Sequence, residues 1–151
     1  MQIPACTFYT DTEVNDDQHC SVLSFAHALE LPYHIAFNEF KSLVHRERNR
    51  ACSTGDCIKV YESTSCGLNG YKVKLKGYYG FFQELNTGRH AKSEEFKACT
   101  LFEFIQRNPT GRFIVHVKGH VTAIINGVLY DGYAQDADQE VLAVFEVFSA
   151  N

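Results

Sequence analysis

The chain contains no tryptophan, and its opening residues lack the basic segment and apolar run of a secretory signal. No apolar run within its 151 residues is long enough to cross a bilayer. These absences argue against secreted and membrane proteins, so we expect a cytoplasmic protein without a membrane partner. The hydrophobic fraction of 45%, with 13% aromatic residues, is enough to build a core without tryptophan.

Positive charge is also scarce. The chain has 14 Lys and Arg against 18 Asp and Glu, which gives a formal net charge of -4. Proteins that bind nucleic-acid backbones need clustered Lys and Arg. The one short basic stretch, residues 45–50, reads as the solvated end of a helix, so we expect no nucleic-acid partner.

None of the six cysteines forms a paired CxxC motif. Cysteines of cytoplasmic proteins stay reduced, so disulfides are not expected. Cys52, Cys57 and Cys66, with His45 nearby, are the best candidates for a structural zinc site, but their spacing is irregular. We therefore expect no metal and no cofactor. The length fits one domain spanning residues 1–151.

Three helices are predicted. Apolar residues recur every three or four positions after Cys20, which indicates a helix over residues 20–29 with Cys20 in its first turn. Pro32 favours the start of a second helix, because proline is disfavoured inside one. A Thr-x-x-Glu capping box at position 100 precedes a third helix over residues 101–105. Residues 46–90 look like loops, with short strands around 58–61 and 71–76.

The C-terminal third predicts strands. Residues 112–126 are rich in β-branched side chains and read as one strand. Asn126-Gly127 is a preferred two-residue hairpin turn, so residues 128–132 should return as the partner strand. A last strand is expected over residues 141–148. The order predicts an α+β fold, with an N-terminal helical portion packed on an antiparallel sheet.

The hairpin register brings two chemically complementary side chains together. With Asn126-Gly127 as the turn, Thr122 faces Asp131, and His120 lies diagonal to Asp131. Alternate strand residues share a face, and such diagonal neighbours lie about 7–8 Å apart. A carboxylate there can hold one imidazole nitrogen protonated and leave the other as a base. The alternative carboxylates, Asp136 and Asp138, fall beyond the strand.

Cys20 is the candidate nucleophile. A thiol at a helix N-terminus has a lowered pKa, because the helix dipole and unpaired amides favour the thiolate. A nearby histidine can take up the proton and return it to a leaving group. Taken singly, Cys20 fits a core thiol, and His120 and Asp131 fit ordinary strand positions. Their order along the chain favours catalysis.

The same residues carry a resemblance to a known family. The segments Asp17-Gln18-His19-Cys20-Ser21-Val22, residues 111–120 and Val128-Leu129-Tyr130-Asp131 resemble a compact papain-like cysteine peptidase. The chain is similar to the small bacteriocin-leader peptidases and to related short proteins often encoded by phages. The resemblance covers the helix at Cys20 and residues 100–132, which is less than half of the chain.

The resemblance implies a site in the cleft between helix and sheet. Cys20 would be the nucleophile, His120 the general base and acid, and Asp131 the orienting carboxylate. An upstream side-chain amide would complete the oxyanion hole; Gln18 is the candidate, Asn15 the alternative, and the Cys20 backbone amide a further donor. The acidic residue three positions before Cys20 makes the ovarian-tumour deubiquitinases, with their Asp-Gly-x-Cys turn, the nearest rival family, although the glycine is missing here.

The expected function is hydrolysis of a peptide or isopeptide bond in a protein or peptide substrate, through a thioester. The same triad performs acyl transfer, transglutamination and deamidation, because either water or an amine can resolve the thioester. The alternative from another class is a non-catalytic, phage-borne binding protein that inhibits a host factor. A phage-encoded protein would act in the host cytoplasm.

Two further motifs have simpler readings. His116 and His120 have the spacing of two zinc ligands on a helix, but on a single strand they would lie about 13 Å apart. We therefore expect His116 to lie beside the site or to be half exposed. The aromatic run at residues 78–82 is expected to belong to the core, with the lining of a substrate groove as the alternative.

Overall fold

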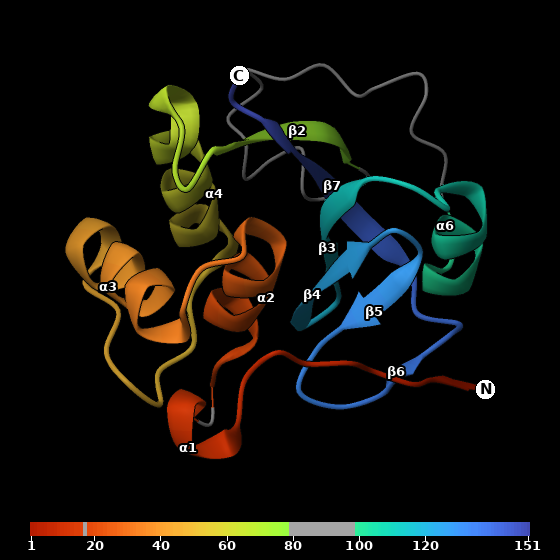
Figure 1. The fold of residues 1–151 in the computed structure, drawn as a ribbon. Coiled ribbons are helices and arrows are strands. Elements are labelled where there is room, and N and C mark those ends of the chain that lie inside the picture. The colour runs from red at the N-terminus through yellow and green to blue at the C-terminus, as the bar shows by residue number, and fades with distance from the viewer. Residues whose placement is uncertain (17, 79–98) are drawn as a thin grey trace.

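The structure is a computed structural model that describes residues 1–16, 18–78 and 99–151. It has the α+β class that the sequence predicts, with helices packed on an antiparallel sheet (Figure 1). The helices are α1 (Asp11–Val14), α2 (Cys20–Leu29), α3 (Tyr33–Val44), α4 (Thr54–Glu62), the short 3-10 helix η1 (Ser63–Cys66) and α6 (Leu101–Arg107). None of these described helices has the length and apolarity needed to span a bilayer.

The main sheet has five antiparallel strands in the order β2-β7-β3-β4-β5. They are β2 (Tyr71–Tyr78), β7 (Val141–Ser149), β3 (Arg112–Val117), β4 (His120–Ile125) and β5 (Val128–Tyr130). A second, two-stranded sheet pairs β1 (Gln2–Ile3) with β6 (Gln135–Asp136). The predicted last strand is thus confirmed, and it lies inside the sheet, between β2 and β3.

Alternating strand residues build two cores, one on each face of the sheet. Ile114 and Phe145 pack with the helices α2, α3 and α4. Val115, which follows Ile114, and Val144, which precedes Phe145, pack with α6 on the opposite face. Because side chains alternate along a strand, a strand covered on both faces is apolar throughout. This explains why β7 shows little polar alternation in the sequence.

The predicted helix at Cys20 is confirmed as α2, which is buried along nearly its whole length. Its second residue and those that follow are all buried, and the helix ends at Glu30 in a left-handed conformation. The helix after Pro32 is also confirmed, with Pro32 as the N-cap of α3. The Thr100 capping box opens α6 as predicted, since Thr100 Oγ1 accepts from the Glu103 amide at 3.1 Å.

Two local predictions are wrong. Residues 58–61, expected as a strand, belong to α4, whose N-cap Ser53 accepts a hydrogen bond from the Asp56 amide at 3.1 Å. The buried face of α4 packs against the α2 and α3 core, and this packing overrides the β preference of its residues. The single strand expected over 112–126 is a hairpin, because the chain turns at Lys118-Gly119, where Gly119 has φ +70°.

The hairpin turn at Asn126-Gly127 is confirmed. Both residues have positive φ, 50° and 76°, as the favoured two-residue hairpin turn requires. The register is the predicted one, with Ala123 opposite Tyr130 and Ile124 opposite Leu129. Asp131 therefore follows β5 at the level that the sequence predicts.

The N-terminal segment covers the outer edge of β5 (Figure 1). The Cys6 amide donates to the Leu129 carbonyl at 2.9 Å, and the Asp131 amide donates to the Cys6 carbonyl at 2.9 Å. An uncovered edge strand would leave these groups unpaired. The contact also fixes the backbone of Asp131. Of the aromatic run at residues 78–82, positions 79–82 lie outside the described residues.

Candidate functional site

Three separate elements bring Cys20, His120 and Asp131 into one group. Cys20 is the first residue of α2, His120 the first residue of β4, and Asp131 follows β5. His120 Nε2 lies 2.6 Å from Asp131 Oδ2, and their side chains are 9% and 2% exposed. The second carboxylate oxygen, Oδ1, accepts the Gly132 amide at 2.7 Å. Asp131 is thus held by the backbone on one side and holds the imidazole on the other.

The surroundings of the Cys20 thiol favour its thiolate form. Burial by itself would raise its pKa, but hydrogen bonding with His120, the positive charge of His120 and the backbone amide of Val121 together lower it below its usual value. Each of these partners interacts more strongly with a thiolate than with a thiol. Cys20 as a residue is half-buried.

The pKa of His120 is shifted upward, because its partners favour the charged imidazolium. Burial would lower its pKa, but the hydrogen bond to Asp131 and the hydrogen bond to Cys20 outweigh burial and raise the pKa to about 9. The lowered thiol pKa and the raised imidazole pKa both favour transfer of the proton from sulfur to nitrogen. A thiolate beside an imidazolium is the reactive form of a cysteine nucleophile.

An aromatic ring covers the histidine. The ring centroids of His120 and Tyr133 are 5.5 Å apart at an interplanar angle of 39°, and Tyr133 itself is exposed. The pKa of Tyr133 is raised by burial and by the charges of Asp131 and Cys20. The ring of Tyr133 therefore contacts the imidazole, and the raised pKa keeps its hydroxyl neutral. The sequence offered no signal for this contact, which depends on the chain path after β5.

The other cysteines whose pKa is shifted have a raised pKa, whereas the pKa of Cys20 is lowered. Burial raises the pKa of Cys52 to about 11 and that of Cys57 to about 12, and it also raises the pKa of Cys99. All six cysteines are free. In the described part of the chain, no group of three or more His, Cys, Asp or Glu side chains is arranged to hold a metal ion.

Of the two expected placements of His116, beside the site or half exposed, the second is wrong, because His116 is buried and its Nε2 lies 3.1 Å from the hydroxyl of Tyr61. It shares the β3–β4 hairpin with His120 instead of a single strand, so the separation of about 13 Å expected for one strand does not apply. Burial and the charge of His120 lower the pKa of His116 to about 3, so it is neutral near pH 7.

The oxyanion-hole candidates lie on the segment before α2. Gln18 is exposed, and its side-chain amide makes no hydrogen bond to any described residue, while its carbonyl accepts from Arg46 Nη2 at 2.6 Å. Asn15 is also exposed and ends α1 with φ +40°. Asp17 lies outside the described residues. The rival carboxylate Asp136 instead accepts the Asp138 amide at 2.9 Å.

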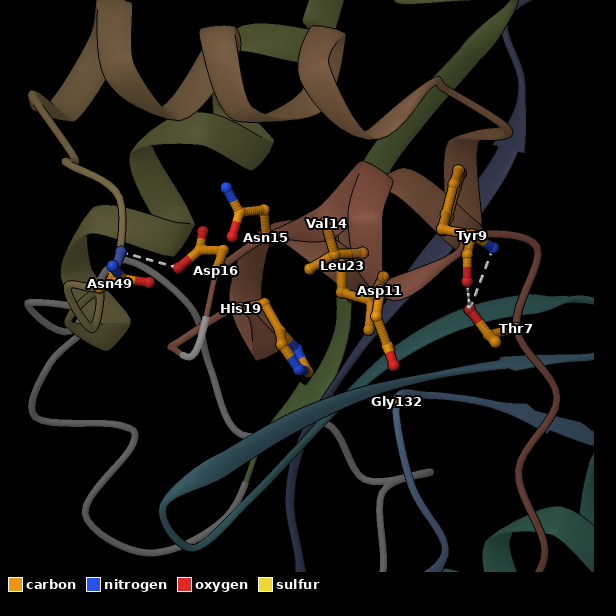
Figure 2. Close-up of a pocket in the computed structure, with 10 residues that line it drawn as sticks. All are labelled: Thr7, Tyr9, Asp11, Val14, Asn15, Asp16, His19, Leu23, Asn49 and Gly132. Atoms are coloured by element: carbon orange, nitrogen blue, oxygen red, sulfur yellow. Dashed lines mark hydrogen bonds between the residues drawn. The ribbon is translucent and has the colours of Figure 1, made fainter.

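A polar hollow of about 550 Å³ adjoins this group (Figure 2). Its lining includes His19 and Gly132, the chain neighbours of Cys20 and Asp131. Gly132 has no room for a side chain, because a Cβ there would lie 2.8 Å from the His19 ring. A second hollow, of about 490 Å³, is lined in part by Gly119, the chain neighbour of His120.

The group can thus favour a thiolate and hold the accepting imidazole in one orientation, and the two hollows are lined by chain neighbours of its members. Comparison with models of protein families, with curated proteins and with solved structures finds no match to this chain.

Proposed function

We propose that the protein is a cysteine-dependent hydrolase that cleaves a peptide or isopeptide bond, with a papain-like arrangement of Cys20, His120 and Asp131. One observation carries the proposal: His120 Nε2 is bound to Asp131 at 2.6 Å, while the same imidazole lowers the pKa of the Cys20 thiol. With Nε2 directed at the carboxylate, Nδ1 is the nitrogen left for the sulfur. A catalytic triad requires a nucleophile in contact with a base, and a base in contact with an orienting group.

Acylation begins with the proton on His120 Nδ1 and the negative charge on Cys20 Sγ. The sulfur attacks the carbonyl carbon, and the π electrons of the carbonyl move onto its oxygen. When the tetrahedral species collapses, the C–N bond breaks and His120 gives its proton to the departing amine. The acyl group is then held as a thioester on Cys20, and the imidazole is neutral. Asp131 keeps the ring in place throughout.

Deacylation uses the same groups in reverse. Neutral His120 removes a proton from water as the water oxygen attacks the thioester carbon, and Cys20 leaves as the thiolate. The carboxylic acid product departs and the thiolate–imidazolium pair is restored. An amine in place of water would give acyl transfer, and a glutamine side chain as the first substrate would give deamidation.

The developing oxyanion needs hydrogen-bond donors. The first amides of a helix have no acceptor within the helix, so the Cys20 amide at the start of α2 is available. We assign the second donor to the side-chain amide of Gln18, two residues earlier, with Asn15 as the alternative. Removal of one such donor lowers turnover by about 10²–10³-fold in enzymes of this kind.

The test is incubation of the purified protein with a library of quenched fluorescent peptides, followed by mass spectrometry of the products. Cleavage by the native protein, and none by Cys20→Ala, supports the proposal. A product one mass unit heavier than an intact peptide indicates deamidation, and a cross-linked pair indicates transamidation.

A thioester intermediate provides a direct measurement that needs no knowledge of the natural substrate. An activated ester such as p-nitrophenyl acetate should acylate Cys20, and intact-protein mass spectrometry should detect the added acetyl group. If Cys20 is acylated no faster than in the unfolded chain, the protein is not an enzyme of this class, and a binding role replaces the proposal.

A further inference from the structure

A buried ion pair lies behind the segment that leads into Cys20. The side chains of Asp16 and Arg46 are 0% and 1% exposed. Arg46 Nη1 lies 2.6 Å from Asp16 Oδ2, and Nη2 lies 2.9 Å from Asp16 Oδ1. The contact is therefore the two-pronged arrangement of a guanidinium and a carboxylate, which fixes orientation as well as distance.

Further bonds hold the carboxylate from other sides. The Tyr33 hydroxyl donates to Oδ2 at 2.7 Å. The Asn49 amide donates to Oδ1 at 2.8 Å, as Figure 2 shows. Burial would raise the pKa of Asp16, but the hydrogen bonds from Arg46, Tyr33 and Asn49 lower it to about 2. The carboxylate is thus ionised throughout the neutral range, and its partners come from α3 and from the residues that follow α3.

The same guanidinium reaches the backbone next to the nucleophile. Arg46 Nη2 donates to the Gln18 carbonyl at 2.6 Å, and the Gln18 amide lies 3.4 Å from Asp16 Oδ1. Both backbone polar groups of Gln18 are therefore held by the ion pair. Because Gln18 is two residues before Cys20, its position sets how the chain enters the first turn of α2.

A role in geometry accounts for this pair better than a role in stability. Taking two charges out of water offsets most of their attraction, so buried pairs are often replaced by apolar residues without loss of stability. Apolar residues cannot, however, hold a carbonyl and an amide in fixed positions. The directed bonds to Gln18 are what an apolar replacement would lose.

We propose that Asp16 and Arg46 are positioning residues that hold the Gln18 backbone, and through it the oxyanion-binding amides of Gln18 and Cys20. The inference rests on the proposed function, because an oxyanion forms only when the thiolate attacks a carbonyl. Alkylation by iodoacetamide attacks a saturated carbon and forms no oxyanion. The two reactions of the same sulfur therefore separate the position of the amides from the reactivity of the thiolate.

The experiment compares these two reactions in the double variant Asp16→Leu/Arg46→Met, which leaves no unpaired buried charge. We expect a folded protein whose Cys20 is alkylated by iodoacetamide at a rate within about twofold of the native rate, while acylation by p-nitrophenyl acetate slows up to about a hundredfold. Equal acylation rates in the native protein and the folded double variant would overturn the inference.

Arg48→Met is the matched control. Arg48 Nη1 also donates to backbone carbonyls, those of Val14 at 3.0 Å and Asn15 at 3.1 Å, without touching Gln18. Arg48→Met should leave both rates unchanged. If it slows acylation as much as the double variant does, any loosening of the loop is sufficient, and the assignment of Asp16 and Arg46 as positioning residues is overturned. Should the double variant not fold, Arg46→Lys retains the charge without the two-pronged contact and should give the same split.

The outcomes also separate this inference from the proposed function. If native Cys20 is not acylated at all, the proposed function fails and the inference fails with it. If native Cys20 is acylated and the folded variants match it, the inference alone fails.

Discussion

His116 and His120 lie on one hairpin, four residues apart, and their pKa values move in opposite directions. Burial lowers the pKa of both. His116 has the hydroxyl of Tyr61 as its partner, and its pKa falls to about 3. His120 has the carboxylate of Asp131 and the thiol of Cys20, and its pKa rises to about 9. Charged partners outweigh burial at His120, whereas burial dominates at His116, so only His120 is able to hold a proton near pH 7.

Replacing each histidine in turn should have very unequal effects on turnover. His120→Ala removes the group that activates the thiol, and we expect a loss beyond about ten-thousandfold. His116→Gln keeps a neutral partner for Tyr61, so activity should change less than about threefold while the protein becomes less stable. Steady-state assays of both variants check this. If His116→Gln loses as much activity as His120→Ala, the comparison is broken.

Asp131→Asn should lower turnover next most, by up to about ten-thousandfold, because the imidazole loses the charge that raises its pKa. The fold should remain intact, since an amide can still accept the Gly132 hydrogen bond. Asp136→Asn is the control, because the Asp136 carboxylate accepts only the Asp138 amide, within its own loop, among the described hydrogen bonds. Full activity in Asp131→Ala together with none in Asp136→Ala would place the orienting carboxylate beyond the hairpin.

Alkylation should distinguish Cys20 from the thiols that burial makes less acidic. At pH 6 we expect iodoacetamide to modify Cys20 at least about tenfold faster than Cys52 or Cys57 in the native protein, because only Cys20 has a lowered pKa among these three. Peptide mapping by mass spectrometry gives the order of labelling. In His120→Ala the preference should disappear. Faster labelling of Cys52 would contradict the assignment of the reactive thiol.

The pH dependence of stability should show the two histidines separately. The stabilisation by His120 is complete below its ordinary pKa of 6.5 and is lost as the pH rises through about 9. That by His116 is complete above 6.5 and is lost as the pH falls from 6.5 toward 3. Denaturant unfolding of the native protein and of His116→Gln from pH 4 to 10 measures both. In His116→Gln, the part of the loss of stability toward acid pH that is due to His116 should be absent, and the loss toward alkaline pH should remain.

The smallest expected effect belongs to Tyr133. Tyr133→Phe keeps the ring over His120 and should change turnover less than about twofold, whereas Tyr133→Ala admits water to the imidazole and should lower turnover about tenfold. The NMR titration of His120 supplies an independent measurement, since only Tyr133→Ala should shift its pKa. A large loss in Tyr133→Phe would assign a role to the hydroxyl instead.

Local signals in the sequence were enough for much of the fold and for the pairing of His120 with Asp131. The apolar spacing after Cys20 predicts α2, and Asn126-Gly127 sets the register that pairs His120 with Asp131. Each signal lies within a few residues of the feature that it predicts, which is why these predictions are confirmed.

The predictions failed where distant packing decides the structure. Ile58, Val60 and Tyr61 of α4 have β preference, which their packing in the core with α2 and α3 overrides. The Ser53 cap was a usable local signal for this helix. The turn at Gly119 was missed because the β-branched run hides it. The Asp16–Arg46 pair joins residues 30 apart, a separation for which no sequence periodicity gives a clue.

The distance along the chain between Cys20 and the groups that lower its pKa has a consequence for biosynthesis. His120 and Val121 are made about a hundred residues after the thiol that they affect. A chain growing from the ribosome therefore carries Cys20 with an ordinary acidity until the β3–β4 hairpin has been made and has docked against α2. The lowered pKa of Cys20 therefore depends on the folding of the C-terminal part of the chain.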